Sequence, residues 1–215
     1  MRRRGAADWL ALGLALVLAA PALACPKDCQ CTSSIVDCSH RGLTRVPFNI
    51  PRNTHKVELQ DNNLTVIRQA DFRDLRQLRA LNLAHNDIHL IEDSSFADAT
   101  RLEKLDLSHN LIRSIPSGTF AKLAKLQEIN LENNQLRCIS ADATDSSNQL
   151  EILRLGGNRL QHLSAQLLRH SPRLRALTLE GNPLVCDCHL TWLARLARGG
   201  LLDPGAVCHA PYREF

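Results

Sequence analysis

The stretch LRALNLAHNDIHLIEDSSFADATRLEKLDLSHN, residues 78–110, contains the pattern that decides the fold. It begins and ends with the same frame, L-x-x-L-x-L-x-x-N, and the two closing asparagines are Asn86 and Asn110. In an extended chain the side chains of x-L-x-L-x alternate between two faces, so the leucines share one face and the x residues the other. One such strand cannot bury its leucines alone, and the pattern therefore predicts that copies stack side by side.

The same frame recurs through residues 54–184, where six asparagines follow one another at intervals of 24: Asn62, Asn86, Asn110, Asn134, Asn158 and Asn182. An apolar residue follows each asparagine by two positions. This spacing resembles the leucine-rich repeat, in which each copy adds one strand to a continuous parallel sheet. We therefore expect an α/β solenoid: a curved leucine-rich-repeat horseshoe of 24-residue repeats, with a concave parallel β-sheet and an irregular convex side. The asparagine amide, a donor and an acceptor together, should bond the backbone of the stacked loops.

A bulky apolar residue is expected ten positions after each asparagine, on the convex side. Phe72, Phe96, Phe120 and Leu168 occupy this position in four copies. The remaining copy has Thr144, within the polar stretch 142–148, and we expect a thin convex wall there.

Residues 1–24 have the composition of a secretory signal peptide. Three arginines at positions 2–4 precede an apolar run from Trp9 to Ala20, and residues 22–24, Ala-Leu-Ala, form a small-x-small cleavage site. A membrane anchor is the alternative, but the run is shorter than the roughly 20 residues that cross a bilayer. We predict a secreted protein without a membrane span, and all eight cysteines, which lie in residues 25–215, then meet an oxidising environment.

Charge balance and motifs argue against several classes of function. Without residues 1–24 the chain has 23 basic and 21 acidic residues, too balanced to indicate a nucleic-acid partner. It contains no G-x-S-x-G, H-E-x-x-H or phosphate-loop motif, and we expect neither catalysis nor a cofactor or metal. His85 and His109 each precede a repeat asparagine and should stack, but a straight row cannot converge on one ion, so we interpret them as surface residues.

Four cysteines cluster before the first repeat, where a solenoid end exposes a strand edge and needs a cap. The run CPKDCQC, followed by VDC, resembles the N-terminal cap of extracellular leucine-rich-repeat proteins. This resemblance implies the disulfides Cys25–Cys31 and Cys29–Cys38. A four-cysteine zinc site is the rival interpretation, although zinc sites favour C-x-x-C pairs.

NPLVCDCHLTWLARL, residues 182–196, resembles the C-terminal cap of the same proteins. A short helix should cover the last repeat here, with Trp192 packed inside the cap. The resemblance implies a Cys186–Cys208 disulfide and leaves Cys188 as a free thiol, because no fourth cysteine follows, so this cap is expected to be truncated. Cys138 lies two repeats away, too far for a disulfide with this cap, and we predict a buried free thiol.

These features divide the chain into a signal peptide (1–24), an N-terminal cap (25–53), six repeats (54–184) and a C-terminal cap (185–215). The chain is most similar to a single repeat domain of Slit, a secreted axon-guidance ligand. The similarity rests on both cysteine runs, on GLTRVPFNIPRNT (residues 42–54) and on the cysteine in NNQLRCI (residues 133–139). It implies a signalling ligand for a Robo-type receptor, either as a fragment of a larger protein or as a small relative.

The x residues of the repeats form the predicted binding surface for a cell-surface or matrix protein, because the concave sheet is the usual binding surface of such solenoids. Small residues, among them Ala80, Ala84, Gly156 and Ala176, would let a partner approach closely. The mixture of charged and amide side chains favours a polar interface. The predicted contact residues are Lys56, Glu58, Gln60, Asn82, Lys104, Asp106, Ser108, Glu128, Asn130, Glu132 and Arg154.

Arginines in the fifth and sixth repeats indicate an alternative function, glycosaminoglycan binding in the extracellular matrix with heparan sulfate as ligand. The candidates, beside His170, are Arg154, Arg159, Arg169, Arg173 and Arg175. A solvated surface is the competing interpretation, because long positive side chains are common there.

Asn63-Leu64-Thr65 is the one N-x-S/T acceptor in the chain. Because Asn63 follows the inward-facing Asn62, it should point outward at the strand edge. The sequence therefore predicts N-glycosylation at Asn63.

Overall fold

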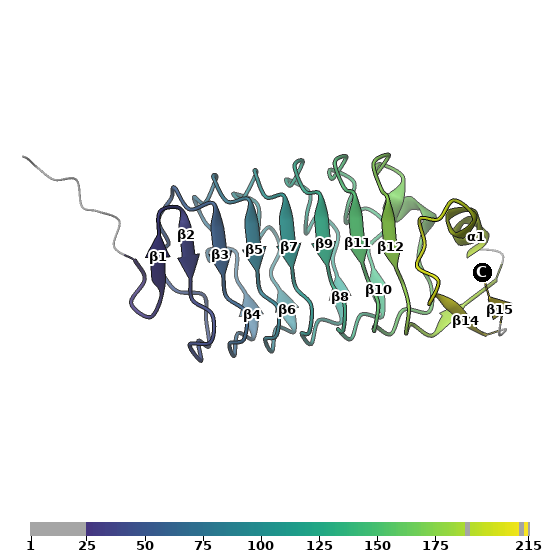
Figure 1. Ribbon diagram of the computed structural model, residues 1–215, viewed down its shortest axis with the longest axis horizontal. Coiled ribbons are helices and arrows are strands. Elements are labelled where there is room, and N and C mark those ends of the chain that lie inside the picture. Colours follow the sequence, from purple (N-terminus) through teal and green to yellow (C-terminus); the bar gives the residue numbers. More distant parts are fainter. Residues whose placement is uncertain (1–24, 188–189, 211–212, 215) are drawn as a thin grey trace, which may run out of the picture.

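The computed structural model describes residues 25–187, 190–210 and 213–214, which form an elongated solenoid with strands side by side in a row (Figure 1). The predicted signal peptide lies outside the described residues. An eight-stranded sheet has the order β1-β2-β3-β5-β7-β9-β11-β12. Strands β1 (Gln30–Thr32) and β2 (Ile35–Asp37) form an antiparallel hairpin, and β2 starts the parallel part. The repeat strands are β3 (Lys56–Glu58), β5 (Ala80–Asn82), β7 (Lys104–Asp106), β9 (Glu128–Asn130), β11 (Ile152–Arg154) and β12 (Ala176–Thr178).

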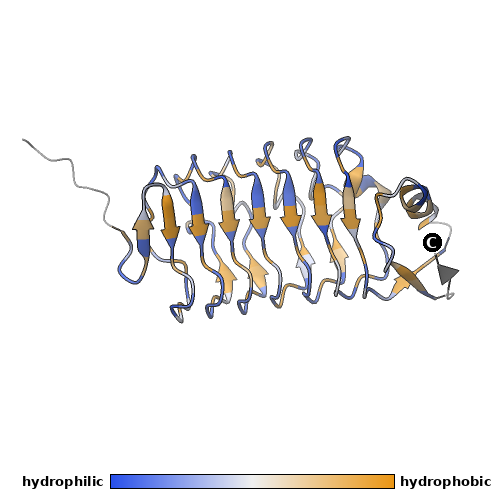
Figure 2. Ribbon diagram, viewed as in Figure 1, coloured by the Kyte–Doolittle hydropathy of each residue, from blue (hydrophilic) through white to orange (hydrophobic). Residues whose placement is uncertain are grey.

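The repeat period fixes the register of the repeat strands. Leu81 lies opposite Leu105, and Leu105 lies opposite Ile129, so equivalent residues of successive copies stand side by side. Figure 2 shows the resulting hydrophobic band across the middle of consecutive strands. These central residues are buried, and together with the flanking leucines they form one continuous core that no single copy could build.

The repeat asparagines are buried and connect neighbouring copies through hydrogen bonds, as the sequence predicted. Asn110 is representative: its amide group donates to the carbonyls of Leu83, Leu107 and Ser108 at 3.0–3.1 Å, and its Oδ1 accepts from the N–H of Ile88 at 3.0 Å. Each copy is thereby joined to the preceding one through both strand and loop backbone.

Short strands on the convex side pair in twos: β4 (Val66–Ile67) with β6 (Leu90–Ile91), and β8 (Ser114–Ile115) with β10 (Cys138–Ile139). The rings of Phe72, Phe96 and Phe120 stack with centroids 5.7 and 6.3 Å apart. Thr144 is buried in the next copy, where its hydroxyl donates to the carbonyl of Leu167.

The fifth copy differs from the prediction on its convex side. Leu167, 1% exposed, fills the interior there, whereas the predicted Leu168 is only partly buried. The reason is local: this copy forms a 3₁₀ helix, η1 (Ala165–Leu168), and its tighter winding turns the preceding residue inward.

The N-terminal cap closes the solenoid with the β1–β2 hairpin and two disulfides. These are Cys25–Cys31 and Cys29–Cys38, with Cα–Cα distances of 5.7 and 4.4 Å, and they are the pairs implied by the resemblance to known caps. Val36 and Cys38 continue the core at this end. All four cysteines are therefore occupied as disulfides rather than as zinc ligands.

The C-terminal cap consists of β13 (Leu184–Val185), helix α1 (Thr191–Arg198), β14 (Val207–Ala210) and β15 (Arg213–Glu214). Leu190 and Leu193 are buried, and Trp192 packs partly buried against the core. Leu202 pairs with Leu177 and so extends the sheet beyond β12. Cys186 and Cys208 form the predicted disulfide, with a Cα–Cα distance of 5.5 Å.

The two cysteines expected to be free have different outcomes. Cys188 lies outside the described residues. Cys138 is free but exposed, so its predicted burial was wrong. Cys138 belongs to β10, in which Ile139 packs against the core; neighbouring residues of a strand face opposite sides, which turns the thiol outward.

Candidate binding surface on the sheet

The outer side of the eight-stranded sheet, here called the sheet face, presents three columns of side chains. The first contains the residue before each central apolar residue, the second the residue after it, and the third the residue two positions further on. The common register keeps these columns straight across the strands. The predicted contact residues lie in the first column (Lys56, Lys104, Glu128), the second (Glu58, Asn82, Asp106, Asn130, Arg154) and the third (Gln60, Ser108, Glu132).

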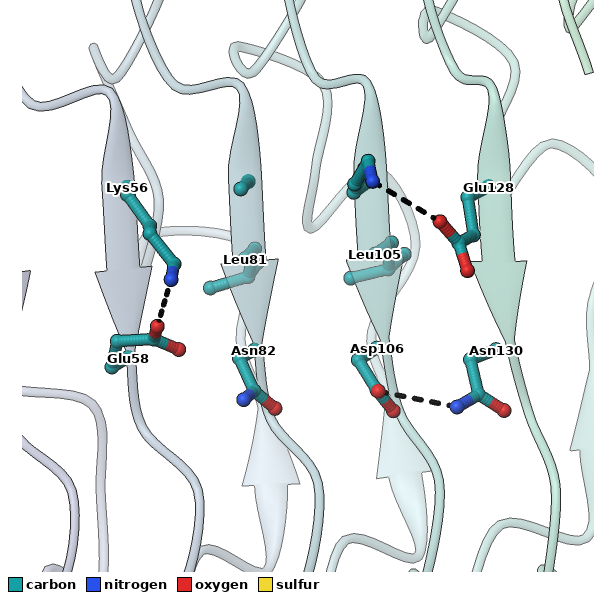
Figure 3. A pocket seen from close by; sticks show the side chains of 10 residues that line it. Lys56, Glu58, Leu81, Asn82, Leu105, Asp106, Glu128 and Asn130 are labelled. Atoms are coloured by element: carbon teal, nitrogen blue, oxygen red, sulfur yellow. Dashed lines mark hydrogen bonds and ion pairs between the residues drawn. The ribbon is translucent and has the colours of Figure 1, made fainter.

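At the first repeat, Lys56 and Glu58 form an ion pair within one strand (Figure 3). The Glu58 side chain is 15% exposed, and its other oxygen, Oε2, is buried with no hydrogen-bond partner among the described residues. The amide oxygen of Gln60 is in the same situation. Because both oxygens are closed off from the surface, they are not contact points for a partner, and the exposed group at this end of the sheet face is the Lys56 ammonium.

Glu128 connects three strands of the sheet face. Its carboxylate pairs with Lys104 of β7 at 3.5 Å and with Arg154 of β11. Burial acts to raise the pKa of Glu128, but the hydrogen bond from Arg154 and the positive charges of Arg154 and Lys104 outweigh it and lower this pKa. Glu128 therefore stabilises the sheet through ion pairs to both neighbouring strands. The Lys104 side chain remains 65% exposed and accessible.

The second-column residues at the strand ends cap the backbone. Asp106 accepts hydrogen bonds from the N–H and the hydroxyl of Ser108, at 2.9 and 2.6 Å, and from the amide of Asn130 at 3.1 Å. Asn82 and Asn130 likewise accept from the N–H two residues further on. Ser108 is only 5% exposed because Asp106 holds its hydroxyl against the strand, so it offers a partner little surface, and its contact with a partner stays a prediction. Ala84, at 7% exposure, likewise offers little surface.

A hollow of about 190 Å³ lies on the sheet face over β3, β5, β7 and β9 (Figure 3). Ala80 causes it, because its methyl group stands in the first column between the long side chains of Lys56 and Lys104. Carboxylates of Glu58 and Asp106 line the same hollow. Donors and acceptors thus surround one small depression, which suits a polar protein surface more than an apolar ligand.

A second hollow, of about 410 Å³, lies toward the C-terminal cap. Gly156 leaves the third column open between Glu132 and Glu180, and Gly205 lines the same space. The hydroxyl of Thr178 donates to Glu132 at 2.9 Å. The sheet face therefore changes along the solenoid, from mixed charges in the first four repeats to a glycine-lined acidic hollow in the last two.

The predicted arginine cluster does not come together as one site. Arg159 follows β11, whereas Arg173 and Arg175 precede β12, so these residues lie at opposite edges of the sheet. Arg154 lies on the sheet face itself, paired with Glu128. Residues near one another in sequence are separated here because the chain crosses the solenoid between them.

Several members of that cluster are also engaged within the chain. Arg175 pairs with Glu151 at 3.0 Å, and Arg173 donates to the side chain of Gln149 at 2.5 Å. Arg169 donates to His170 at 3.3 Å. Arg113 and Arg137, which are not among the predicted residues, occupy the same position in adjacent copies because they are separated by one full repeat.

The remaining predicted surface residues are exposed. The rings of His85 and His109 stack with centroids 4.1 Å apart, and Asn63 faces outward next to buried Asn62. Glycosylation of Asn63 stays a prediction. In the described part of the chain, no cluster of three or more histidine, cysteine or acidic side chains is arranged to hold a metal ion. Among the same residues, no helix combines the length and apolar character that a membrane crossing requires.

A stacked solenoid with one open polar sheet and disulfide-bonded caps defines a repeat protein built for macromolecular recognition. The chain belongs to the leucine-rich-repeat family: the leucine-rich-repeat model matches residues 52–112, 100–160 and 139–184. The leucine-rich-repeat N-terminal domain matches residues 24–51, which contain the first two disulfides.

Matching relatives are small leucine-rich proteoglycans. Decorin of Coturnix japonica is 47% identical and asporin of Bos taurus 49% identical, each over 57 residues that make up 26% of this chain. Biglycan of Xenopus laevis is 46% identical over the same length. The matched segment spans only 15–16% of these relatives.

A solved structure of the complex of TLR13 with ssRNA13 has a similar fold, with a TM-score of 0.69 and 28% sequence identity. The similarity covers 75% of this chain and 24% of the TLR13 chain. The repeat architecture is thus shared well beyond the proteoglycan segment.

Proposed function

We propose that this chain is a secreted protein of the extracellular matrix that binds another matrix or cell-surface protein through the first four repeats of its sheet face. The observation that carries the proposal is the hollow over β3 to β9, which combines the exposed ammonium groups of Lys56 and Lys104 with the carboxylates of Glu58 and Asp106. Such a surface supplies hydrogen bonds and charge pairs, as in polar, wet interfaces. The partner would have to contribute most of the aromatic anchors.

Two further observations support secretion and a matrix role. Three disulfides fit an oxidising compartment. The relatives reported above are matrix proteoglycans, and they favour a matrix role over a Slit-like axon-guidance ligand or a Robo-type receptor as partner. As family members typically act as binding modules, we infer a non-enzymatic role.

The test blocks the hollow without disturbing the core. Ala80→Tyr places a ring between Lys56 and Lys104, on the solvent side of β5. The matched control is Ala176→Tyr, in the same column of β12 but outside the hollow. The unaltered chain and the control should capture the same proteins from a matrix extract, and Ala80→Tyr should lose them. Equal capture by all three chains would contradict the proposal.

The structure also changes the choice of charge variants. Reversal of Asp106 and Glu128 is one obvious test, because both belong to the predicted contact residues. In the fold, Asp106 accepts a hydrogen bond from the N–H of Ser108, and Glu128 forms ion pairs with Lys104 and Arg154. Reversal of the charges of Asp106 and Glu128 would therefore also destabilise the sheet. Neutralisation of the exposed Lys104 is the cleaner change, because it places no like charge opposite Glu128, and Lys104→Gln should weaken partner binding with a smaller effect on folding.

Glycosaminoglycan binding is the second candidate function. The class of the relatives favours a matrix environment in which sulfated polysaccharides are plentiful. The arginines that sequence alone put forward are divided between two edges and the sheet face, so this function needs a different surface.

A further inference from the structure

One edge of the solenoid carries arginines without acidic neighbours. We define the exit edge as the segments where the chain leaves each sheet strand and runs to the convex side, at the lower edge of Figure 1: residues 110–115, 134–139 and 158–163 in the third to fifth repeats. These segments contain Arg113, Arg137, Arg159 and His162, and no aspartate or glutamate.

The backbone places these arginines in successive copies. The N–H of Arg137 donates to the carbonyl of Arg113 at 3.0 Å, so the two residues hold the same position on adjacent turns, about 4.8 Å apart. The N–H of Arg159 donates to Leu136 at 2.9 Å, which places Arg159 on the next turn. Arg113 and Arg137 therefore stand side by side. Arg159 lies on the next turn but two positions before their equivalent there, Gln161, so the three arginines follow the solenoid axis with Arg159 offset along the chain.

All three arginines are exposed, and none makes an ion pair or a side-chain hydrogen bond with a described residue. Arginines elsewhere behave differently. Arg79 and Arg175 each pair with a glutamate on a neighbouring turn, at 3.1 and 3.0 Å. At the edge where the chain enters the strands, the repeat places a glutamate beside Arg79 and beside Arg175. At the exit edge it places no acidic residue beside the three arginines in the same way.

This arrangement leaves positive charges close together. The backbones of Arg113 and Arg137 lie about 5 Å apart, so their exposed positive side chains repel one another, and salt screens this repulsion only in part at short distances. The acidic residues nearest in sequence to the three arginines are Asp106, Glu132, Asp142 and Glu151, and all four are engaged within the chain. Asp106 accepts from Ser108 and Glu132 from Thr178. Asp142 accepts hydrogen bonds from Ser117 and Ser140 at 2.6 Å each, and Glu151 pairs with Arg175. A negatively charged ligand would relieve the repulsion.

We propose that the exit edge binds a sulfated polysaccharide, with Arg113, Arg137 and Arg159 contacting successive sulfate groups. The proposal rests on the second candidate function and gives it a site. Charges on three successive turns of the solenoid match a linear polymer that carries repeated charge, and guanidinium groups bind such oxyanions through paired hydrogen bonds. The three segments contain no phenylalanine, tyrosine or tryptophan on which a nucleic-acid base could stack, which disfavours single-stranded nucleic acid.

The experiment compares the full secreted chain with the variant Arg113→Gln, Arg137→Gln, Arg159→Gln, and uses heparin as the probe. The variant should elute from a heparin column at clearly lower salt and bind heparin in solution about tenfold or more weakly, because it loses three charge-assisted contacts. Its melting temperature should be unchanged, since the three side chains form no ion pair or hydrogen bond with a described residue.

The matched control is Arg73→Gln, Arg76→Gln, Lys122→Gln, which removes the same charge from exposed positions on the convex side. It should keep nearly all heparin affinity. Equal loss in both variants would mean that heparin senses net charge alone and would overturn the proposal, as would full binding by the exit-edge variant.

Two further probes test the ligand class. Desulfated heparin should bind poorly, and binding equal to that of heparin would contradict recognition of sulfate. Single-stranded DNA of matched charge should bind more weakly than heparin; equal binding, lost in the same variant, would overturn the choice of a polysaccharide. The exit-edge variant should still capture the proteins that Ala80→Tyr loses, so this proposal and the sheet-face proposal can fail separately.

Discussion

Among single residues, the repeat asparagines have the most sharply defined role. Each is almost completely buried, between 4 and 7% exposed, and serves backbone groups of two copies. Leucine at this position would fill space but could not accept from one N–H and donate to carbonyls. A buried polar side chain is favourable here because the loop backbone of a solenoid has no partner in its own copy.

We expect Asn110→Ala to lower the free energy of unfolding by about 2–4 kcal/mol, because it leaves the buried N–H of Ile88 and several carbonyls without their partner. Urea denaturation followed by circular dichroism measures the change. The control Asn148→Ala removes an exposed asparagine and should cost less than about 0.5 kcal/mol. Similar losses in both variants would refute the role assigned to Asn110.

Residue identity and spacing predicted the buried asparagines and leucines, because these positions repeat and have one physical solution. They could not predict the exposure of Cys138 or the burial of Ser108. Both depend on local hydrogen bonding and strand pairing on top of the repeat: Ile139 takes the inward position beside Cys138, and Asp106 draws in the Ser108 hydroxyl. Neither constraint is visible in the repeat period.

At the scale of elements, the sheet face is joined across strands by ion pairs as well as by backbone hydrogen bonds. Glu128 is the central case, since it lies on β9 and contacts cations on both neighbouring strands. Its lowered pKa means that the folded state favours the charged carboxylate. This contribution to stability is fully present above the ordinary pKa of glutamate, near 4.3, and is lost as the pH falls through the folded pKa.

The pH dependence gives a direct test. Glu128→Gln should reduce stability at pH 7, and its difference from the unaltered protein should shrink as the pH falls from about 5 to 3, because the native carboxylate is then protonated. Denaturation at several pH values gives the curve. Arg154→Met removes the cation that lowers the pKa of Glu128. The stability of this variant should therefore depend less on pH between about 5 and 3. A difference that stays constant down to pH 3 would show that Glu128 is not held charged.

Elements also explain why the arginines that the sequence groups for glycosaminoglycan binding do not lie together in the fold. Arg159 and Arg173 fall within one repeat length of each other, yet one follows β11 and the other precedes β12. Arg113 and Arg137 are a full repeat apart, yet their backbones are hydrogen bonded. In a solenoid, proximity follows the period rather than the sequence distance, so a surface is predicted by comparing equivalent positions rather than neighbouring ones.

Taken as a whole molecule, the solenoid separates two candidate surfaces. The hollow on the sheet face lies over β3 to β9, and the exit edge carries its arginines in the third to fifth repeats, on the segments that follow the strands. No residue that lines the hollow belongs to the exit edge. A rigid stack of this kind holds both surfaces at fixed positions, so one molecule can contact a protein and a polysaccharide together.

Independence of the two surfaces is therefore the expectation for the intact chain. Heparin at saturating concentration should leave capture of the matrix proteins within about twofold, since the ligands share no contact residue and neither needs the fold to change. Ala80→Tyr should lose protein capture and keep heparin affinity, and the exit-edge variant should show the reverse. Biolayer measurements with immobilised chain, adding the two ligands in either order, distinguish the cases. Competition between the ligands would mean that they share one surface, and reciprocal enhancement would mean that the partner protein itself contacts the polysaccharide.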